Sequence, residues 1–466
     1  MKQKIIYTII CFVLAQCCIW QPFSNKAMGA TVNETEALAI ADLWYAMELN
    51  SGYLSIDPAE KEECLRNIPL HTIQYFIAED QLLDYIPPDL PVLAYVITYY
   101  PNGYVIIPGD DRILPVIAFD VVSEFRWDHP ELNFMRHYLN TRIPAYWENL
   151  GIDTHPGWEQ LRSKIHESLE KVKFDEPTDD RSVYLLWETA LWGQGTYYNE
   201  TVIANNGGTA GIPTGCTATA MAIKMRFHSW PVTGNSSHSY NDVWGAVQYS
   251  HSVNFGTKTY YWSLMPTSTL TSTNTYVGDL MYHCGVAVDM NYEVGISCAW
   301  PSASSMNTYF RYKGSYNIWA PSAYASDMQT SILGGLPVVT SSSAHTVLAD
   351  GYRDTQSPYF HLNCGWNSAG NGWYDLSTGF PGGDPSIDYS MPFCQPQHYF
   401  YVNGSYSGTE NGNLKTPYNT IDEGYSATPT NGELWIKGGT YSGTTNTGTF
   451  DKAMMIKNYQ GTVTIQ

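Results

Sequence analysis

Cys216 is the residue of this sequence whose surroundings best suit a nucleophile. It lies in the stretch 213–231, PTGCTATAMAIKMRFHSWP, which predicts a loop that leads into a buried helix. Apolar residues recur there at helical spacing, at Ala220, Ile223 and Phe227. A thiol at the N-terminus of a helix faces free backbone N–H groups and the positive end of the helix dipole, and both favour the thiolate that attacks carbon. The alternative is a small buried core cysteine, which is the commoner role of a free cysteine.

His345 is the candidate base for this nucleophile. Attack on a peptide carbonyl needs a thiolate, an imidazole that holds it and later protonates the leaving amine, and hydrogen-bond donors for the oxyanion. Cys216 and His345 are far apart in the sequence, so only the fold can bring them together. Taken alone, His345 is more often a core histidine with satisfied hydrogen bonds. The assignment therefore depends on the combination of Cys216 with the motifs that flank both residues.

Other histidines and cysteines could indicate a metal site. His361 lies near Cys364 and His283 lies beside Cys284, but neither pair has a second ligand pair at a spacing typical of zinc sites. His228, near the end of the predicted helix, suits the helix dipole as a charged imidazole. We therefore expect no metal and no cofactor.

Length and composition narrow the class of protein. A chain of 466 residues is long enough for about three domains of roughly 150 residues each. The hydrophobic fraction of 44% and charged fraction of 15% are typical of a globular protein. A net charge of −20, without any basic run, argues against nucleic-acid binding. Five of the nine cysteines lie from Cys216 onward, an odd number, so at least one of them has no disulfide partner within that region.

The first residues predict export. Residues 1–29 combine a basic start with an apolar stretch, Ile5 to Ala15, that is too short to span a bilayer comfortably, and small residues near Gly29 suit a signal peptidase. Cys17 leaves a lipoprotein signal open as an alternative. No later segment reaches the ~18 uninterrupted apolar residues of a spanning helix. We expect a secreted or cell-surface protein without a membrane span.

The region 30–172 predicts a small α+β domain. A capping box at 33–36 precedes a helix, and a good hairpin signal is followed by more extended chain. The charged, proline-broken segment that follows is typical of an exposed linker, where proteolytic cleavage concentrates. The predicted elements are a helix from 37, strands over 93–100, 104–107 and 114–119, helices over 132–150 and 157–172, and a linker over 173–181.

The region 182–395 predicts a second domain in which the helix that begins with Cys216 precedes the sheet. This order favours an α+β fold. Asp350 and Gly351 suit a turn after the strand that contains Val347. The strands are predicted over 338–339, 347–349, 359–363 and 372–376.

The region 399–466 changes character, with few charges and many Gly, Thr, Asn and Tyr residues. A strand from 400, a short helix near 417–421 and a strand over 434–441 are followed by short strands over 454–459 and 463–465. This β-rich pattern is similar to the opening turn of a parallel β-helix. One or two coils cannot bury a core, because stacked repeats need at least about three neighbours. We interpret the segment as a truncation or a small appendage.

Several stretches of the second domain together resemble the streptopain family of cysteine peptidases, over roughly residues 182–393. One stretch of the first domain, NGYVIIPGDDR at 102–112, resembles the signature of the family's inhibitory prodomain. The matching stretches of the second domain are QGTYYN at 194–199, GCTATA at 215–220 with FHSWP at 227–231, GVAVDMNY at 285–292, and HTVLADG at 345–351 with HLNCGW at 361–366.

The resemblance implies a papain-like peptidase domain, made as a zymogen and inhibited by its own prodomain. In such a domain Cys216 would be the nucleophile and His345 its base. Gln194 would share the oxyanion hole with the Cys216 N–H, and Asn363 and Trp366 would orient and shield the histidine. The substrates would be proteins or peptides, and cleavage in the linker would release the enzyme.

The sequence departs from the family at two places. Cys364 stands where the family usually has a tryptophan, and Asn367 and Ser368 replace a pair of glycines. We expect the missing indole to loosen the wall beside the histidine and to put a second thiol near the site. Neither change touches the nucleophile or the base, so we expect activity to remain.

The sequence thus predicts a secreted cysteine endopeptidase. Two alternatives stay open. In one, a catalytically silent peptidase fold serves as a surface-binding protein whose last segment contacts glycan or a cell surface. In the other, the same cysteine and histidine serve an acyl transferase.

Overall fold

The structure is a computed structural model. The predicted signal peptide, the linker over 173–181 and the predicted helix over 132–150 lie outside the residues that it describes. Within those residues, no helix combines the length and the apolar character needed to cross a bilayer. The described residues are 31–50, 63–64, 67–68, 71–77, 81–85, 91–112, 115–121, 125, 156–168, 183–186, 189–244, 247–316, 321–341, 345–353, 359–375 and 389–466.

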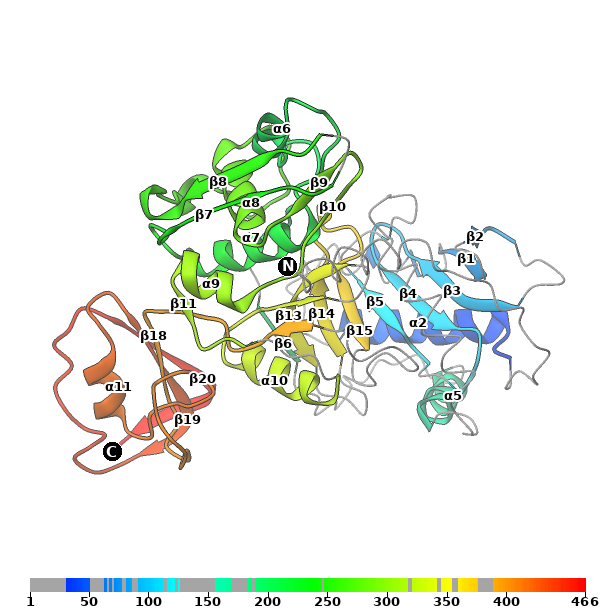
Figure 1. The fold of residues 1–466 in the computed structure, drawn as a ribbon. Coiled ribbons are helices and arrows are strands. Elements are labelled where there is room, and N and C mark those ends of the chain that lie inside the picture. Colours follow the sequence, from blue (N-terminus) through cyan, green and yellow to red (C-terminus); the bar gives the residue numbers. More distant parts are fainter. Residues whose placement is uncertain are drawn as a thin grey trace.

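An antiparallel sheet of eleven strands joins the first domain to the second (Figure 1). Its order is β16-β12-β13-β14-β15-β5-β4-β3-β1-β2, with β6 paired to β13. Helices cover the sheet, so the predicted α+β class is confirmed. The strands are β1 (Thr72–Ile77), β2 (Gln81–Leu83), β3 (Val92–Thr98), β4 (Tyr104–Pro108), β5 (Ala118–Asp120), β6 (Val183–Leu185), β12 (Val338–Ser341), β13 (Thr346–Arg353), β14 (Tyr359–Asn363), β15 (Gly372–Asp375) and β16 (Tyr389–Met391).

The first domain follows the sequence signals closely. Helix α2 (Glu34–Asn50) is capped as predicted, because Oδ1 of Asn33 accepts the N–H of Glu36 at 3.0 Å. Strands β3 and β4 form the predicted hairpin, and Gly103 takes the positive φ of 107° that its turn requires. Helix α5 (Pro156–Ser168) contacts α2, and an apolar cluster fills the space between α2 and the sheet.

In the second domain, helix α7 (Cys216–His228) joins a helical half to the sheet half (Figure 1). Small or apolar side chains occupy almost every face of this helix itself. The helix is therefore buried between α8 (Thr275–Ala287) and strands β12 and β13. It begins at Cys216 as predicted and ends before Pro231. The other helices here are α6 (Glu200–Asn205), α8 (Thr275–Ala287), α9 (Ala303–Phe310) and α10 (Pro321–Leu333), with the hairpins β7 (Ser237–Asn241)–β8 (Ser250–Asn254) and β9 (Asn291–Glu293)–β10 (Ile296–Cys298).

The turn predicted at Asp350 and Gly351 is wrong. Both residues lie inside β13, which pairs with β14 on one side and β6 on the other. The register shifts between Ala349 and Gly351, so the residue pair that locally favours a turn forms a bulge instead. Pairing on both sides overrides the local preference and leaves the buried Asp350 in the middle of the sheet.

The last segment forms a parallel sheet, β18 (Tyr399–Val402), β19 (Glu433–Tyr441) and β20 (Met455–Ile465), with helix α11 (Ile421–Ala427) between the first two strands. The helix begins later than predicted, and the two last predicted strands are one strand. The expectation that so short a segment cannot bury a core also needs correction. Tyr401 and Leu414 pack against Leu336 in the second domain, which supplies the surface that further coils would otherwise supply.

Candidate active site

The nucleophile candidate Cys216 is the first residue of α7, where the sequence placed it. Gly215 precedes it with a φ of 87°, and a Cβ at this position would lie 2.7 Å from Cε of Met290. Only glycine fits that turn. Directly after Cys216, Thr217 Oγ1 lies 2.9 Å from Oγ1 of Thr346, the residue after His345. This threonine pair joins the helix to the strand and brings the two candidate catalytic residues together.

The Cys216 thiol is activated by its surroundings. Burial alone would raise its pKa, but the charge of His345, a hydrogen bond with His345 and hydrogen bonds with Thr346 outweigh burial, and the pKa falls from 9.0 to about 7. A thiol with this pKa is substantially ionised at neutral pH. Its position at a helix N-terminus favours the thiolate as well.

The His345 ring is held on two sides. Its Nε2 lies 2.9 Å from the carbonyl oxygen of Cys364, and its face stacks on Trp366 with ring centroids 4.2 Å apart. A carbonyl oxygen can only accept, so Nε2 is the nitrogen that donates. This leaves Nδ1 for the thiol of Cys216. The protein thereby fixes one tautomer of the neutral ring, the one in which Nδ1 can take a proton.

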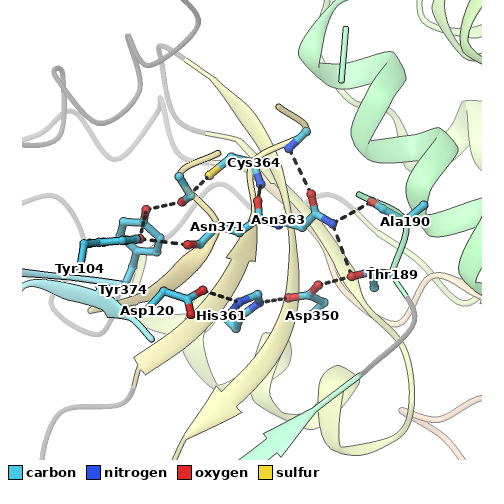
Figure 2. A network of polar contacts seen from close by, with 12 residues as sticks. Tyr104, Asp120, Thr189, Ala190, Asp350, His361, Asn363, Cys364, Asn371 and Tyr374 are labelled. Carbon is cyan, nitrogen blue, oxygen red and sulfur yellow. Dashed lines mark hydrogen bonds and ion pairs between the residues drawn. The ribbon is translucent and has the colours of Figure 1, made fainter. Parts of the chain in front are cut away.

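Asn363 acts on the turn that follows it. Its amide donates to the carbonyl of Ala190 at 3.0 Å, and its Oδ1 accepts the N–H of Gly365 at 3.1 Å (Figure 2). The resemblance had implied that Asn363 orients the histidine. In the structure the oxygen against the His345 ring belongs to the backbone of the next residue, Cys364. Sequence reasoning missed this group because a backbone carbonyl leaves no signature in residue type.

The departure at Cys364 has a smaller consequence than expected. Its thiol donates to the carbonyl of Gly370 at 3.1 Å, and its N–H donates to Oδ1 of Asn371 at 2.8 Å. The side chain is buried, and burial raises the pKa of the thiol, so it is inert where Cys216 is reactive. The indole wall beside His345 comes from Trp366, which remains in place.

The second departure, at Asn367 and Ser368, falls on two residues with positive φ, 55° and 70°. Glycine is the residue that adopts this conformation without strain, and asparagine tolerates it better than most. Asn367 also makes contacts that glycine could not, since its Oδ1 accepts the hydroxyl of Tyr198 at 2.7 Å. A Cβ at Gly193 would lie 2.7 Å from this same oxygen, so Asn367 packs closely on the segment that leads to Gln194.

Gln194 is buried next to the loop that leads to Cys216. Its backbone carbonyl accepts the N–H of Thr214, in that loop, at 2.9 Å. The neighbouring Trp192 carbonyl accepts the N–H of Asn367 at 3.2 Å. At Gly195 a Cβ would meet nothing within 4 Å, so the chain is open there. The structure thus gathers the five sequence-predicted residues, Gln194, Cys216, His345, Asn363 and Trp366, where α7 meets the sheet.

A second histidine belongs to a network that sequence reasoning missed. His361 lies on β14 between two carboxylates: its Nδ1 is 2.6 Å from Oδ1 of Asp350, and its Nε2 is 3.7 Å from Oδ2 of Asp120 (Figure 2). Burial would lower the pKa of His361, but these two carboxylates raise it to about 10. Within the described residues, no group of three or more His, Cys, Asp or Glu side chains is arranged to hold a metal.

The comparison with protein families gives the site its context. The model of the peptidase C10 family matches residues 192–374, the region that contains all five residues. This part of the chain is similar to the streptopain-like cysteine peptidases. Streptopain of Streptococcus pyogenes is 24% identical over 316 residues, which are 61% of this chain and 74% of streptopain. The thiol protease/hemagglutinin PrtT of Porphyromonas gingivalis is 24% identical over 315 residues, 60% of this chain but 33% of PrtT.

Two solved structures of streptopain-like proteins are also similar. A prointerpain A fragment of Prevotella intermedia gives a TM-score of 0.47 at 22% identity and covers 64% of this chain and 94% of that fragment. Active interpain A of the same organism gives 0.37 at 28% identity and covers 45% of this chain and 92% of that enzyme.

Proposed function

We propose that this protein is a secreted cysteine endopeptidase, made as a zymogen, in which Cys216 and His345 cleave peptide bonds. The observation that carries the proposal is the lowered pKa of the Cys216 thiol beside an imidazole whose other nitrogen is already fixed by a carbonyl. The papain-like arrangement, with the cysteine at the start of a helix and the histidine directly before a strand of the sheet, supports it.

In the proposed reaction, the Cys216 thiolate attacks the carbonyl carbon of the scissile bond. The oxyanion that forms accepts hydrogen bonds from the Cys216 N–H and the Gln194 side chain. As the carbon–nitrogen bond breaks, the imidazolium of His345 gives its Nδ1 proton to the leaving amine and an acyl-enzyme thioester remains. His345 then takes a proton from water, the hydroxide attacks the thioester, and the acid product leaves with the thiol restored.

Strand pairing and a side-chain ion pair join the proposed prodomain, residues 30–172, to the proposed peptidase domain, residues 182–395. Strand β5 pairs with β15, at Phe119↔Trp373 and Ala118↔Tyr374. Glu48 of α2 forms a buried ion pair with Arg353, at 2.6 Å. These contacts support inhibition by the prodomain until the linker 173–181 is cleaved. The proposed appendage, 399–466, remains attached to the peptidase domain.

Substitution of Cys216 tests the proposal. The Cys216→Ala protein, incubated with a reducing thiol, is expected to leave casein intact, whereas the wild-type chain digests it. Cys298→Ser is the matched control, because Cys298 is another half-buried cysteine, and it should retain activity. Casein digestion by Cys216→Ala would disprove the assignment. Transfer of an added amine to a glutamine peptide, without hydrolysis, would instead indicate an acyl transferase.

A further inference from the structure

His361 lies outside the reaction centre yet is connected to it by a chain of hydrogen bonds. From the histidine, the chain passes to the carboxylate of Asp350 at 2.6 Å, and Asp350 Oδ2 accepts the hydroxyl of Thr189 at 2.5 Å (Figure 2). The Thr189 oxygen then accepts the amide of Asn363 at 3.4 Å. Asp350 and Asn363 are each 1% exposed, whereas Thr189 and His361 are half-buried.

The far end of this chain is the turn that holds the catalytic histidine. Asn363 fixes the N–H of Gly365 at 3.1 Å and the carbonyl of Ala190 at 3.0 Å. Between Asn363 and Gly365 lies Cys364, whose carbonyl accepts from His345, and one residue further is Trp366, which stacks on the same ring. A shift of the Asn363 side chain would therefore move both groups that orient His345.

The direction of each hydrogen bond makes the chain depend on the charge of His361. The Thr189 hydroxyl has a single proton and donates it to Asp350, so its lone pairs remain for Asn363. Asp350 is a buried carboxylate, and the positive charge that faces it is that of His361. Without that charge the carboxylate would be buried uncompensated, at a cost large enough to force it to move.

The groups that face His361 come from three strands. Asp350 of β13 faces Nδ1, Asp120 of β5 faces Nε2, and the Trp373 ring of β15 packs edge-on with centroids 5.3 Å apart. In the proposed zymogen the prodomain supplies Asp120. After removal of the prodomain, Asp350 would remain as the partner on the peptidase side.

We propose that His361 is a positioning residue of the peptidase, which holds the His345 ring in its reactive orientation through Asp350, Thr189 and Asn363. The inference rests on the proposed function of Cys216 and His345. It assigns His361 no contact with substrate. A purely structural role would change the amount of folded enzyme, whereas a positioning role changes the pairing between His345 and Cys216.

The test compares His361→Gln and Thr189→Val with wild type as full-length chains. Steady-state kinetics on a fluorogenic peptide follow treatment with a reducing thiol, and the rate of Cys216 alkylation by chloroacetamide is measured across pH by mass spectrometry of the Cys216 peptide. We expect His361→Gln to lower kcat by about 10- to 100-fold with KM within about twofold, since small misplacements of catalytic groups cost this much. The midpoint of alkylation should move up from about 7 toward 9.

Thr189→Val removes the hydroxyl link without removing a charge, and it should shift kcat and the midpoint in the same direction by less. His238→Gln is the matched control, because His238 also lies 2.6 Å from a carboxylate, that of Asp289, but is partly exposed on β7. It should leave both quantities unchanged. If His361→Gln does not fold, Thr189→Val decides the question.

An unchanged alkylation midpoint in the folded variants would overturn this inference alone. So would a loss of kcat in His361→Gln that only follows the loss of folded protein, measured by circular dichroism. Peptidase activity that survives in Cys216→Ala would overturn the proposed function itself, so the two failures are distinguishable.

Discussion

Two histidines of the second domain, His345 and His361, show how surroundings decide what an imidazole does. His345 faces a thiol and a carbonyl oxygen and stacks on Trp366. His361 faces two carboxylates, and their charges raise its pKa to about 10. The first lies beside the Cys216 thiol, whose pKa it lowers, while the second is held in its charged form by the two carboxylates.

The comparison teaches that one sheet carries both a reactive centre and a fixed positive charge. The reactive centre lies where α7 meets β13, on the side of the helical half. The fixed charge lies on β14, which β15 separates from the first domain, and Asp120 of that domain faces it. Loss of the reactive centre should abolish peptide-bond cleavage. Substitutions around His361 should instead alter the packing of the first domain and the orientation of the His345 ring.

The largest effect is expected at the reactive centre. His345→Ala removes the base and the charge that stabilises the thiolate, so peptidase activity should fall by at least about 10⁴-fold. The loss is measured on a fluorogenic peptide after treatment with thiol. Activity within tenfold of wild type would show that another group serves as the base.

The next effect concerns the interface between the first and second domains, called the seam below, to which the Glu48–Arg353 ion pair belongs. Glu48→Gln leaves Arg353 buried without its partner, and loss of one partner of a buried ion pair costs about 3 kcal/mol or more. In the Cys216→Ala background, which prevents self-processing, this should appear as lower stability in urea. In the active chain, peptidase activity should appear sooner after addition of thiol.

Glu36→Gln is the control for this prediction. Glu36 pairs with Arg162 at the same 2.6 Å but within the first domain and nearer to solvent. Glu36→Gln should lower the free energy of unfolding by less than about 1 kcal/mol and leave the onset of activity unchanged. Equal effects of the two substitutions would contradict a special role of the seam.

Much of this fold was predictable because its signals are local. The capping box at Asn33, the hairpin around Gly103 and the helix that begins at Cys216 each depend on neighbours in the sequence. The turn predicted at Asp350 failed because strands distant in the sequence pair with it on both sides. The parallel arrangement of the last segment followed from its β-rich pattern, but part of the surface that buries it belongs to the preceding region, at Leu336.

The candidate site was predictable only in part, for the same reason. Residue types and motifs indicated Cys216 and His345, whereas the carbonyl of Cys364 could not be located because backbone groups have no residue signature. Asp120 lies far from His361 in the sequence, and no local pattern connects them. Only the pairing of β5 with β15 brings this carboxylate to the histidine.

The pH dependence of the seam tests the fixed charge. Because the folded-state pKa of His361 is raised from 6.5 to about 10, its contribution to stability is complete below about pH 6.5 and is lost as the pH rises through about 10. In the Cys216→Ala background, the stability difference between the parent and His361→Gln should shrink over this window. A difference that stays constant from pH 6 to pH 10 would contradict the charge assignment.

The smallest effect is expected at Tyr104. Its hydroxyl, on the first domain, lies 3.0 Å from the carbonyl of Asn371 and 3.0 Å from the hydroxyl of Tyr374. Tyr104→Phe should lower the free energy of unfolding, measured in urea, by about 1 kcal/mol and hasten the onset of activity slightly. Tyr95→Phe, which loses a buried hydroxyl contact within the first domain, should cost as much without changing the onset. An earlier onset of activity in Tyr95→Phe than in Tyr104→Phe would show that contacts within the first domain, and not those at Tyr104, limit activation.

The most direct test of the central claim is the alkylation rate of Cys216 as a function of pH, in wild type and in His345→Ala. The lowered pKa means that the reactive thiolate is present above about pH 7 and is lost as the pH falls through that value. Wild type should therefore show a midpoint near 7, and His345→Ala a midpoint displaced toward 9. The same midpoint in both proteins would contradict the pairing of Cys216 with His345.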